Sequence, residues 1–175
     1  MEWHGFTVQC PLVLGGSVNE AEVLGATVWL WMHSVRHREA PLEALPELLL
    51  PAIRQRQYVL ACQDSRPVFF MSWAWLDAQA EQHYLTRWPL LVPEAAWQSG
   101  ERMWVIDWVA PFGHTRQMTR LLRSELFPTH CLRSLWHRGA ERGKRVKCFW
   151  GDRVSQDALR TWRHNYPLCA DVIEC

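Results

Sequence analysis

The sequence lacks the features of a membrane or exported protein. No apolar run approaches the ~18 residues that a membrane span requires, and the N-terminus MEWHGFTVQCPL has no basic segment leading into an apolar one. Its six cysteines include no Cys-x-x-Cys pair, so neither a zinc site nor a disulfide framework is indicated. We therefore expect a cytoplasmic protein with no stable membrane insertion.

Lysine is absent from the first two thirds of the chain. Residues 1–113 hold seven arginines and twelve acidic residues, whereas residues 114–163 hold twelve basic residues and four acidic ones. Such a basic C-terminal third can attract an anionic partner, which would be an acidic protein or a nucleic acid. The alternative is that these charges only form a solvated face. The chain has no recognisable nucleic-acid-binding motif with interleaved aromatic residues, so we expect no nucleic-acid partner.

Apolar residues are plentiful enough for a core. Of the 175 residues 49% are hydrophobic, and we expect one domain over residues 1–175. The patterns predict a helix over 17–33, where Ser17 before Glu20 and Asn19 before Glu22 are helix-starting patterns, and short interrupted helices over 40–57. Strands over 57–63 and 68–76, joined by a turn at 64–67, are expected to form an antiparallel pair. A strand follows within 99–111, then a helix over 114–127, strands over 131–138 and 145–150, and a helix over 155–166. Residues 77–98 show no clear pattern. This order predicts an α+β fold, with a mixed β-sheet flanked by helices.

One carboxylate interrupts the apolar run MWVIDWVAPFG at residues 103–113. Side chains alternate along a strand, so Val105, Asp107 and Val109 share one face and Asp107 competes for an interior position. A buried carboxylate needs a hydrogen-bond donor. Asp107 either accepts backbone N–H groups at a strand end or orients a catalytic base.

Eight histidines are available as that base, most of them expected at the surface. His33 and His37 are four residues apart, the spacing of a two-histidine metal site on one helix face. The sequence has neither the accompanying Glu nor a clear third ligand. We therefore expect no metal site.

Four stretches together resemble a known family: EVLGATVWLWMHSVRHR at 22–38, LPAIRQRQYVL at 50–60, PVFFMSWAWL at 67–76 and SGERMWVIDWVAPFG at 99–113. Over residues 20 to 152, in the same order and spacing, the chain resembles the RTX toxin-activating lysine acyltransferases, the hemolysin-activating kind. The resemblance implies a GNAT-like fold. It also implies transfer of a fatty acyl group from acyl carrier protein to internal lysines of an RTX protoxin. Residues 1–20 are an N-terminal extension outside the resemblance.

The resemblance also assigns roles to particular residues. The catalytic His of the family falls on His37 and the catalytic Asp on Asp107, which would hold His37 in its working tautomer. Ser34 matches a serine that the family carries ahead of the His. We expect direct transfer to the substrate lysine, with an acyl-Ser34 or acyl-His37 intermediate as the alternative.

The acyl donor is expected to be a carrier protein, with no tightly bound cofactor. GNAT enzymes that use coenzyme A bind its pyrophosphate in a Gly-rich loop, but APFGHTRQM at 110–118 has one glycine. A phosphopantetheine arm attached to an acidic carrier needs no such loop, and the basic third offers that carrier a surface.

Candidate binding residues follow from the same resemblance. Arg133 matches an arginine of the family pattern and is the first candidate for contacting the carrier or its phosphate. Arg138, Lys144, Arg145 and Lys147 come next, unless they only keep the protein in solution. Most of the twelve tryptophans are expected in the core, where their large rings bury much area. Trp73 and Met71 are candidates for lining an acyl tunnel, with the protein core as the alternative.

The chain also departs from the family pattern. EAP at 39–41 stands where the family has an x-W-P turn, Leu48 where it has asparagine, and Trp136 where it has a second arginine. Because of these departures, an alternative function remains: a catalytically silent protein that binds an acyl carrier or a protoxin as a chaperone. The resemblance is compatible with a homodimer.

Overall fold

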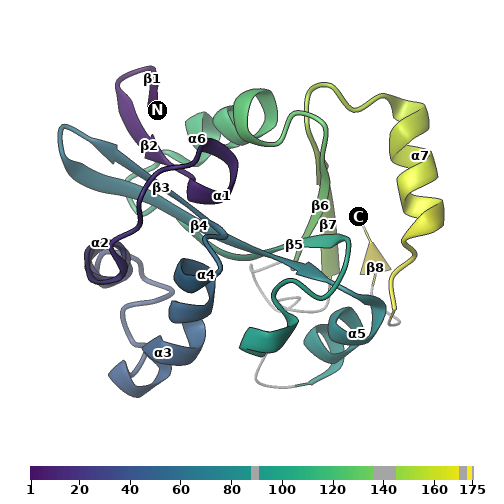
Figure 1. Ribbon diagram of the computed structural model, residues 1–175, viewed down its shortest axis with the longest axis horizontal. Coiled ribbons are helices and arrows are strands. Elements are labelled where there is room, and N and C mark those ends of the chain that lie inside the picture. The colour runs from purple at the N-terminus through teal and green to yellow at the C-terminus, as the bar shows by residue number, and fades with distance from the viewer. Residues whose placement is uncertain (88–90, 136–144, 170–172, 175) are drawn as a thin grey trace. The chain divides into compact units, whose positions relative to one another are not determined.

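The computed structural model describes residues 1–87, 91–135, 145–169 and 173–174 (Figure 1). The chain forms two compact units: the first comprises Met1–Trp73 and Ile106–Leu121, and the second Ala74–Val105 and Leu122–Cys175. Strands β4 and β5 each contribute residues to both units. The single-domain organisation expected over residues 1–175 stays a prediction.

The strands of the first unit pair antiparallel in chain order. They are β1 (Glu2–Trp3), β2 (Phe6–Gln9), β3 (Tyr58–Gln63) and β4 (Arg66–Leu76). The predicted turn between β3 and β4 contains Asp64 and Ser65, with φ of 49° and 63°. Two successive positive φ values match the twist of a two-residue hairpin turn. The antiparallel pair expected from the two apolar runs is therefore confirmed.

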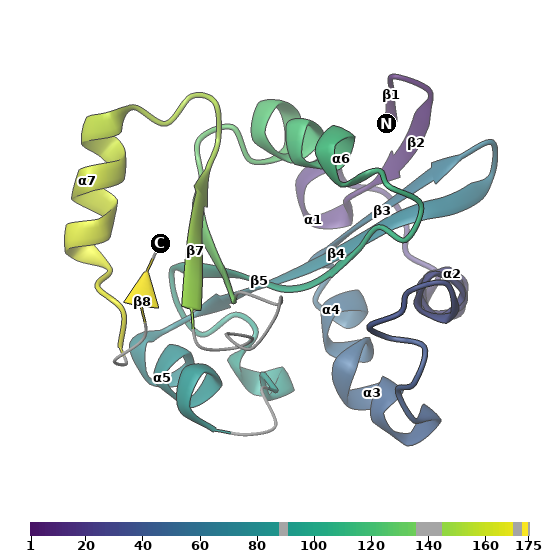
Figure 2. The ribbon, with the colours of Figure 1, turned by 180° about the vertical axis from the view of Figure 1, so that it is seen from behind.

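Several helices of the first unit are short and have a proline in their first turn. The helices of this unit are α1 (Pro11–Leu14), α2 (Glu20–Met32), η1 (Leu42–Ala44), α3 (Leu45–Leu48), α4 (Leu50–Arg54) and α6 (Thr115–Leu121). Asn19 caps α2 by accepting a hydrogen bond from the Glu22 N–H at 3.3 Å. Proline lies in the first turn of α1, α3 and α4, where its missing N–H costs no helical bond. Figures 1 and 2 show α2, α3 and α4 on one side of the β3–β4 hairpin and α6 on the other.

The core of the first unit joins these elements. Its buried residues come from α2, the segment Leu49–Ile53, β3, β4 and the end of β5: Val23, Leu30, Trp31, Leu49, Ile53, Tyr58, Leu60, Phe70 and Val109. Burying about ten large apolar side chains at roughly 1.5–3 kcal/mol each is the main stabilisation of this unit. The core therefore holds the C-terminal end of α2 against β5.

The second unit has both parallel and antiparallel strand pairs. Its elements are α5 (Ala78–Thr86), η2 (Glu94–Ala96), β5 (Arg102–Val109, shared with the first unit), η3 (Leu122–Leu126), β6 (Cys131–Leu135), β7 (Arg145–Trp150), α7 (Gln156–Asn165) and β8 (Ile173–Glu174). Strand β6 runs parallel to β5 and antiparallel to β7, and β8 runs parallel to β7. The predicted α+β class with a mixed sheet is confirmed and is consistent with a GNAT-like fold.

Side-chain caps begin the two longer helices of the second unit. Asp77 accepts from the Ala80 N–H at 2.7 Å to start α5, and Ser155 accepts from the Ala158 N–H at 3.1 Å to start α7. Helix α7 lies within the helix expected over 155–166, whereas α5 lies in the segment without a clear pattern. Its buried Glu81 is one reason, because a charge on the inner face hides the apolar period.

Candidate functional site

His37 and Asp107 meet inside the first unit although 70 positions separate them. Nε2 of His37 lies 2.9 Å from Oδ1 of Asp107, and their side chains are 9% and 10% exposed. His37 belongs to the turn that follows α2, and Asp107 to β5. Val105 and Val109 are buried on the same face of β5 as Asp107, as the alternation predicts. The structure therefore brings the two expected residues into direct contact.

Three donors satisfy the Asp107 carboxylate. Oδ1 accepts from His37 and from the backbone N–H of Trp108 at 2.8 Å, and Oδ2 accepts from Nε1 of Trp31 at 3.1 Å. Burial raises the pKa of Asp107, but the hydrogen bond and charge of His37, with the charge of Arg36 and the Trp108 N–H, hold it below its ordinary value. Asp107 is therefore an anion at neutral pH. Asp107 accepts a backbone N–H and also contacts a histidine, and its role in orienting a catalytic base stays a prediction.

A tight turn sets the position of Ser34 relative to His37. The Ser34 carbonyl accepts from the backbone N–H groups of His37 and Arg38, both at 3.0 Å. The turn begins where the Ser34 N–H donates to the carbonyl of Trp31 at 3.0 Å. It places Oγ of Ser34 2.7 Å from Nδ1 of His37. Both ring nitrogens of His37 thus have a partner.

The two partners define the tautomer of a neutral His37. A carboxylate can only accept, so Nε2 carries the hydrogen that His37 donates to Asp107. Nδ1 then holds the lone pair and accepts from the Ser34 hydroxyl. A serine, a histidine and an aspartate in this order can move a proton between a substrate and the imidazole, while the carboxylate stabilises the imidazolium.

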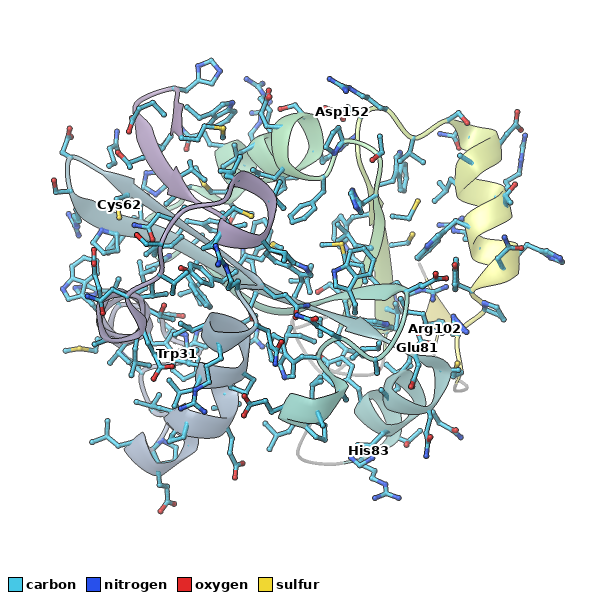
Figure 3. The ribbon with its side chains drawn as sticks, in the orientation of Figure 1. Trp31, Cys62, Glu81, His83, Arg102 and Asp152 are labelled. Carbon is cyan, nitrogen blue, oxygen red and sulfur yellow. The ribbon has the colours of Figure 1, made fainter. Side chains whose placement is uncertain are left out.

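Trp31 completes the site and was missed by the sequence reasoning, which assigned the tryptophans to the core. Its indole ring stacks on the His37 ring, with centroids 5.0 Å apart and planes 29° apart. It is 5% exposed, and Figure 3 labels it in the region of α2. A buried indole N–H needs an acceptor, and Asp107 was expected to need a donor, so the two requirements together point to this pair.

Apolar and basic side chains surround the turn. Met32 and Val35 are 65% and 78% exposed and flank Ser34 in the sequence. Arg36 and Arg38 are exposed on either side of His37. The surface beside the buried pair therefore has an apolar and a cationic component.

The remaining binding candidates have different environments. Trp73 and Met71 on β4 are completely buried, so both contribute to the core of the protein, and the acyl-tunnel role stays a prediction. Arg145 and Lys147 lie on β7 and are partly exposed. Arg138, Lys144 and the departure at Trp136 lie outside the described residues.

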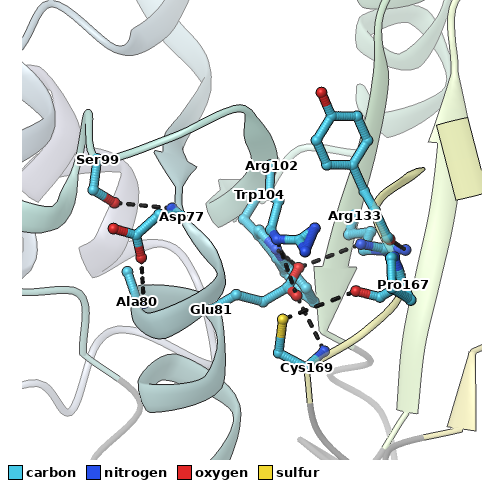
Figure 4. A network of polar contacts seen from close by, with 10 residues as sticks. Asp77, Ala80, Glu81, Ser99, Arg102, Trp104, Arg133, Pro167 and Cys169 are labelled. Atoms are coloured by element: carbon cyan, nitrogen blue, oxygen red, sulfur yellow. Dashed lines mark hydrogen bonds and ion pairs between the residues drawn. The ribbon is translucent and has the colours of Figure 1, made fainter.

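Arg133 is buried within the second unit. It is 1% exposed, and its guanidinium donates to Oε1 of Glu81 at 3.3 Å (Figure 4). It also donates to the carbonyl of Tyr166 at 2.6 Å. The Trp162 ring lies 4.6 Å from its guanidinium carbon. These internal contacts differ from the exposed cation that a carrier-binding role suggests. That role stays a prediction.

Glu81 is the centre of this second cluster and was not expected from the sequence. It is fully buried and accepts from Nε1 of Trp104 at 2.8 Å and from the backbone N–H of Cys169 at 3.2 Å. Nε of Arg102 lies 3.6 Å away, at ion-pair distance. The carboxylate therefore links α5 to β5, β6 and the segment after α7 (Figure 4).

The described residues contain no group of three His, Cys, Asp or Glu side chains placed to hold a metal ion. In the described part of the chain, no helix combines the length and apolar character that a membrane crossing requires.

The α+β fold and the Ser34–His37–Asp107 arrangement define a protein equipped for proton transfer at a buried imidazole. A model of the HlyC RTX toxin acyltransferase family matches residues 16–150. The chain therefore belongs to the RTX toxin acyltransferase family, as its motifs predict, and is an acyltransferase.

Individual relatives support this assignment. The chain is 38% identical over 139 residues to the RTX-I toxin-activating lysine-acyltransferase ApxIC of Actinobacillus pleuropneumoniae, covering 79% of this chain and 80% of the relative. It is 40% identical over 140 residues to the leukotoxin-activating lysine-acyltransferase LktC serotype A1 of Mannheimia haemolytica, covering 79% and 82%. It is 41% identical over 114 residues to the protein-lysine myristoyltransferase HlyC of Escherichia coli, covering 65% and 66%.

Proposed function

We propose that this chain transfers a fatty acyl group from acyl carrier protein to the ε-amino groups of internal lysines in an RTX protoxin, and so activates the toxin. The observation that carries the proposal is the buried His37–Asp107 pair at 2.9 Å in a member of an acyltransferase family. The relatives named above are lysine acyltransferases or a lysine myristoyltransferase by name. Reaction in the cytoplasm and a homodimeric state stay predictions.

The base has a clear task in this reaction. A lysine with an ordinary pKa near 10.4 is ammonium at neutral pH, and freeing its lone pair costs about 4 kcal/mol. In the tautomer set by Asp107, Nδ1 of His37 is the nitrogen that accepts this proton. The Ser34 hydroxyl can pass it on, because it can accept a proton from the amine while donating its own to Nδ1.

The acyl group then moves in one displacement. The free amine attacks the thioester carbonyl, the new C–N bond forms, and the C–S bond to the phosphopantetheine arm breaks. The imidazolium gives the proton taken from the ammonium to the departing thiolate, and the attacking nitrogen releases its second proton to solvent as the amide forms, so His37 ends the cycle neutral. Asp107 stabilises the imidazolium through Nε2–H during this cycle without taking the proton.

A covalent route would use the same three residues. Ser34 would attack the thioester after losing its proton to Nδ1, and lysine would then attack acyl-Ser34. A thiol nucleophile has less support, because burial raises the pKa of Cys10 to about 12 and the pKa values of Cys131 and Cys169 to about 11. Direct transfer stays our proposal. Intact mass measurement of the chain after incubation with acylated carrier alone distinguishes the two routes.

The environment of the loop after β5 supports a carrier-protein donor. The segment 110–114 connects β5 to α6 and contains one glycine, Gly113, with a φ of 87°. A pyrophosphate-binding loop has several glycines. The basic residues of 114–163 supply charge that is complementary to an acidic carrier. We therefore propose acyl carrier protein, rather than acyl-coenzyme A, as the donor.

Mass spectrometry of an RTX protoxin tests the function directly. We expect a fatty-acyl mass increment on lysine when protoxin, acylated carrier and this chain are combined, and none when any one is omitted. His37→Ala should lower the rate at least about 100-fold, because a positioned base contributes that much, whereas His164→Ala on the exposed face of α7 should not change it. Binding of protoxin without any acylation by the natural chain would instead favour the chaperone alternative.

A further inference from the structure

We propose that Trp31 is the positioning residue of the site, and that its indole holds His37 and Asp107 in their working arrangement through two separate contacts. This inference rests on the proposed function, because it assigns a role within the same reaction. It adds to the site a residue that the sequence predicted only as part of the core.

The first contact fixes the carboxylate plane. Oδ1 of Asp107 accepts from His37 and from the Trp108 N–H, whereas the Trp31 N–H is the donor that the described structure gives to Oδ2. With donors on both oxygens, rotation about the Cβ–Cγ bond of Asp107 breaks a hydrogen bond in either direction. The carboxylate therefore presents Oδ1 to His37 in one orientation.

The second contact fixes the imidazole plane. The Trp31 ring lies almost parallel to the His37 ring, at 29°, with the centroids 5.0 Å apart. Tilting the imidazole about its Cβ–Cγ bond would press it into the indole. The ring is thereby held with one nitrogen toward Asp107 and the other toward Ser34.

Trp31 also touches the third member of the site through its main chain. Its carbonyl accepts the N–H of Ser34 at 3.0 Å, where the catalytic turn begins. This bond does not depend on the side chain, so it survives substitution. Replacing the side chain therefore separates positioning of the His37–Asp107 pair from the path of the backbone.

Tryptophan supplies a combination that other residues do not. Its indole is a large flat ring that also carries a donor and no acceptor. It can therefore stack on an imidazole and hold a carboxylate without ever competing for the reacting proton. Phenylalanine keeps the ring and loses the donor, which makes Trp31→Phe the informative variant.

The matched control is Trp29→Phe on the same helix. Trp29 is partly buried and packs on His33 and Phe112, two residues that belong neither to the turn hydrogen bonds nor to the His37–Asp107 pair. Steady-state acylation of a protoxin peptide should show a 10- to 100-fold lower kcat for Trp31→Phe with KM for the acylated carrier changed less than about twofold, the usual effect of losing a residue that orients a catalytic group. Trp29→Phe should change both constants less than about twofold.

Two NMR measurements separate positioning from general damage to the fold. The proton shared by His37 Nε2 and Asp107 should give a sharp downfield signal in the natural chain and in Trp29→Phe, and a broadened or lost signal in Trp31→Phe. In the natural chain, the Trp31 indole N–H should exchange with solvent at least about 100-fold more slowly than that of Trp29, because it is buried and bound to a carboxylate.

The outcomes distinguish this inference from the proposed function. Acylation by Trp31→Phe at the natural rate, or rapid exchange of the Trp31 indole, overturns the positioning role and leaves the function intact. If the natural chain acylates nothing, the proposed function fails, while the downfield signal and the exchange rate still decide whether Trp31 orders the pair. If Trp31→Phe does not fold, the exchange rate of the Trp31 indole in the natural chain still supports or overturns the positioning role.

Discussion

Oγ of Ser34 and Nδ1 of His37 lie 2.7 Å apart, on the side of the imidazole away from Asp107. This contact places the hydroxyl at Nδ1, the nitrogen that accepts the proton in the proposed reaction. Ser34 is thus a member of the site with its own testable role, whichever route the acyl group takes.

Ser34→Ala should distinguish the two routes. In direct transfer the alanine removes a proton relay and one hydrogen bond of roughly 1 kcal/mol, so the rate should fall about tenfold. In the covalent route it removes the nucleophile, so acylation should cease. Initial rates of lysine acylation measure the difference, and a mass increment on the natural chain that is absent in Ser34→Ala would contradict direct transfer.

Asp107→Asn should leave the site folded but reverse the preferred tautomer of His37. An amide can present its NH₂ group to Nε2, which moves the imidazole hydrogen to Nδ1 and removes the lone pair from the reacting side. The loss in kcat should approach the roughly 10⁴-fold effect of the same change in serine proteases. A near-normal rate in Asp107→Asn, with an unchanged thermal melting point, would exclude a role for the carboxylate in tautomer selection.

The stability of the chain should depend on the ionisation of Asp107. Its pKa is held below the ordinary value of 3.8 in the folded chain, so the folded state binds this proton less readily than the unfolded state. The resulting stabilisation is complete above the ordinary pKa and is lost as pH falls below it toward the folded pKa. In denaturant titrations from about pH 5 downward, the free energy of unfolding of the natural chain should therefore fall more steeply than that of Asp107→Asn. Parallel curves would contradict the lowered pKa.

Glu81 should contribute far more to the free energy of unfolding than an exposed acidic residue in the same unit. Glu81→Ala removes the carboxylate that pairs with the guanidinium of Arg133, whose side chain is 1% exposed, and breaking a buried pair of this kind costs about 3–5 kcal/mol. Asp157→Asn is the control, because Asp157 pairs with Arg160 on the exposed face of α7 and such pairs contribute less than about 1 kcal/mol. Urea unfolding measures both. Equal midpoints for the two variants would show that the cluster is not structural.

Local patterns predicted most of the elements because short-range chemistry determines them. The Asn19 cap of α2, the Asp64–Ser65 turn and the alternation along β5 each depend on neighbouring residues only. The segment 77–98 could not be assigned, since the burial of Glu81 depends on partners from β5, β6 and the end of the chain.

The features of the site likewise fall into those that the sequence predicted and those that it did not. That Asp107 needed a donor followed from its apolar neighbours, and the family motifs pointed to His37 and Ser34. That Trp31 would supply one of the donors, and that Arg133 would be buried rather than exposed, did not follow.

By itself, the sequence determined the class of fold, the family and the residue types that its chemistry requires, because capping, turn formation and side-chain alternation act over a few residues. Only the tertiary structure decided which groups became partners. A hydrogen bond forms between atoms brought within about 3 Å. Trp31 as a partner of Asp107, Trp104 as a partner of Glu81 and Tyr166 as a partner of Arg133 are each more than 20 positions away along the chain.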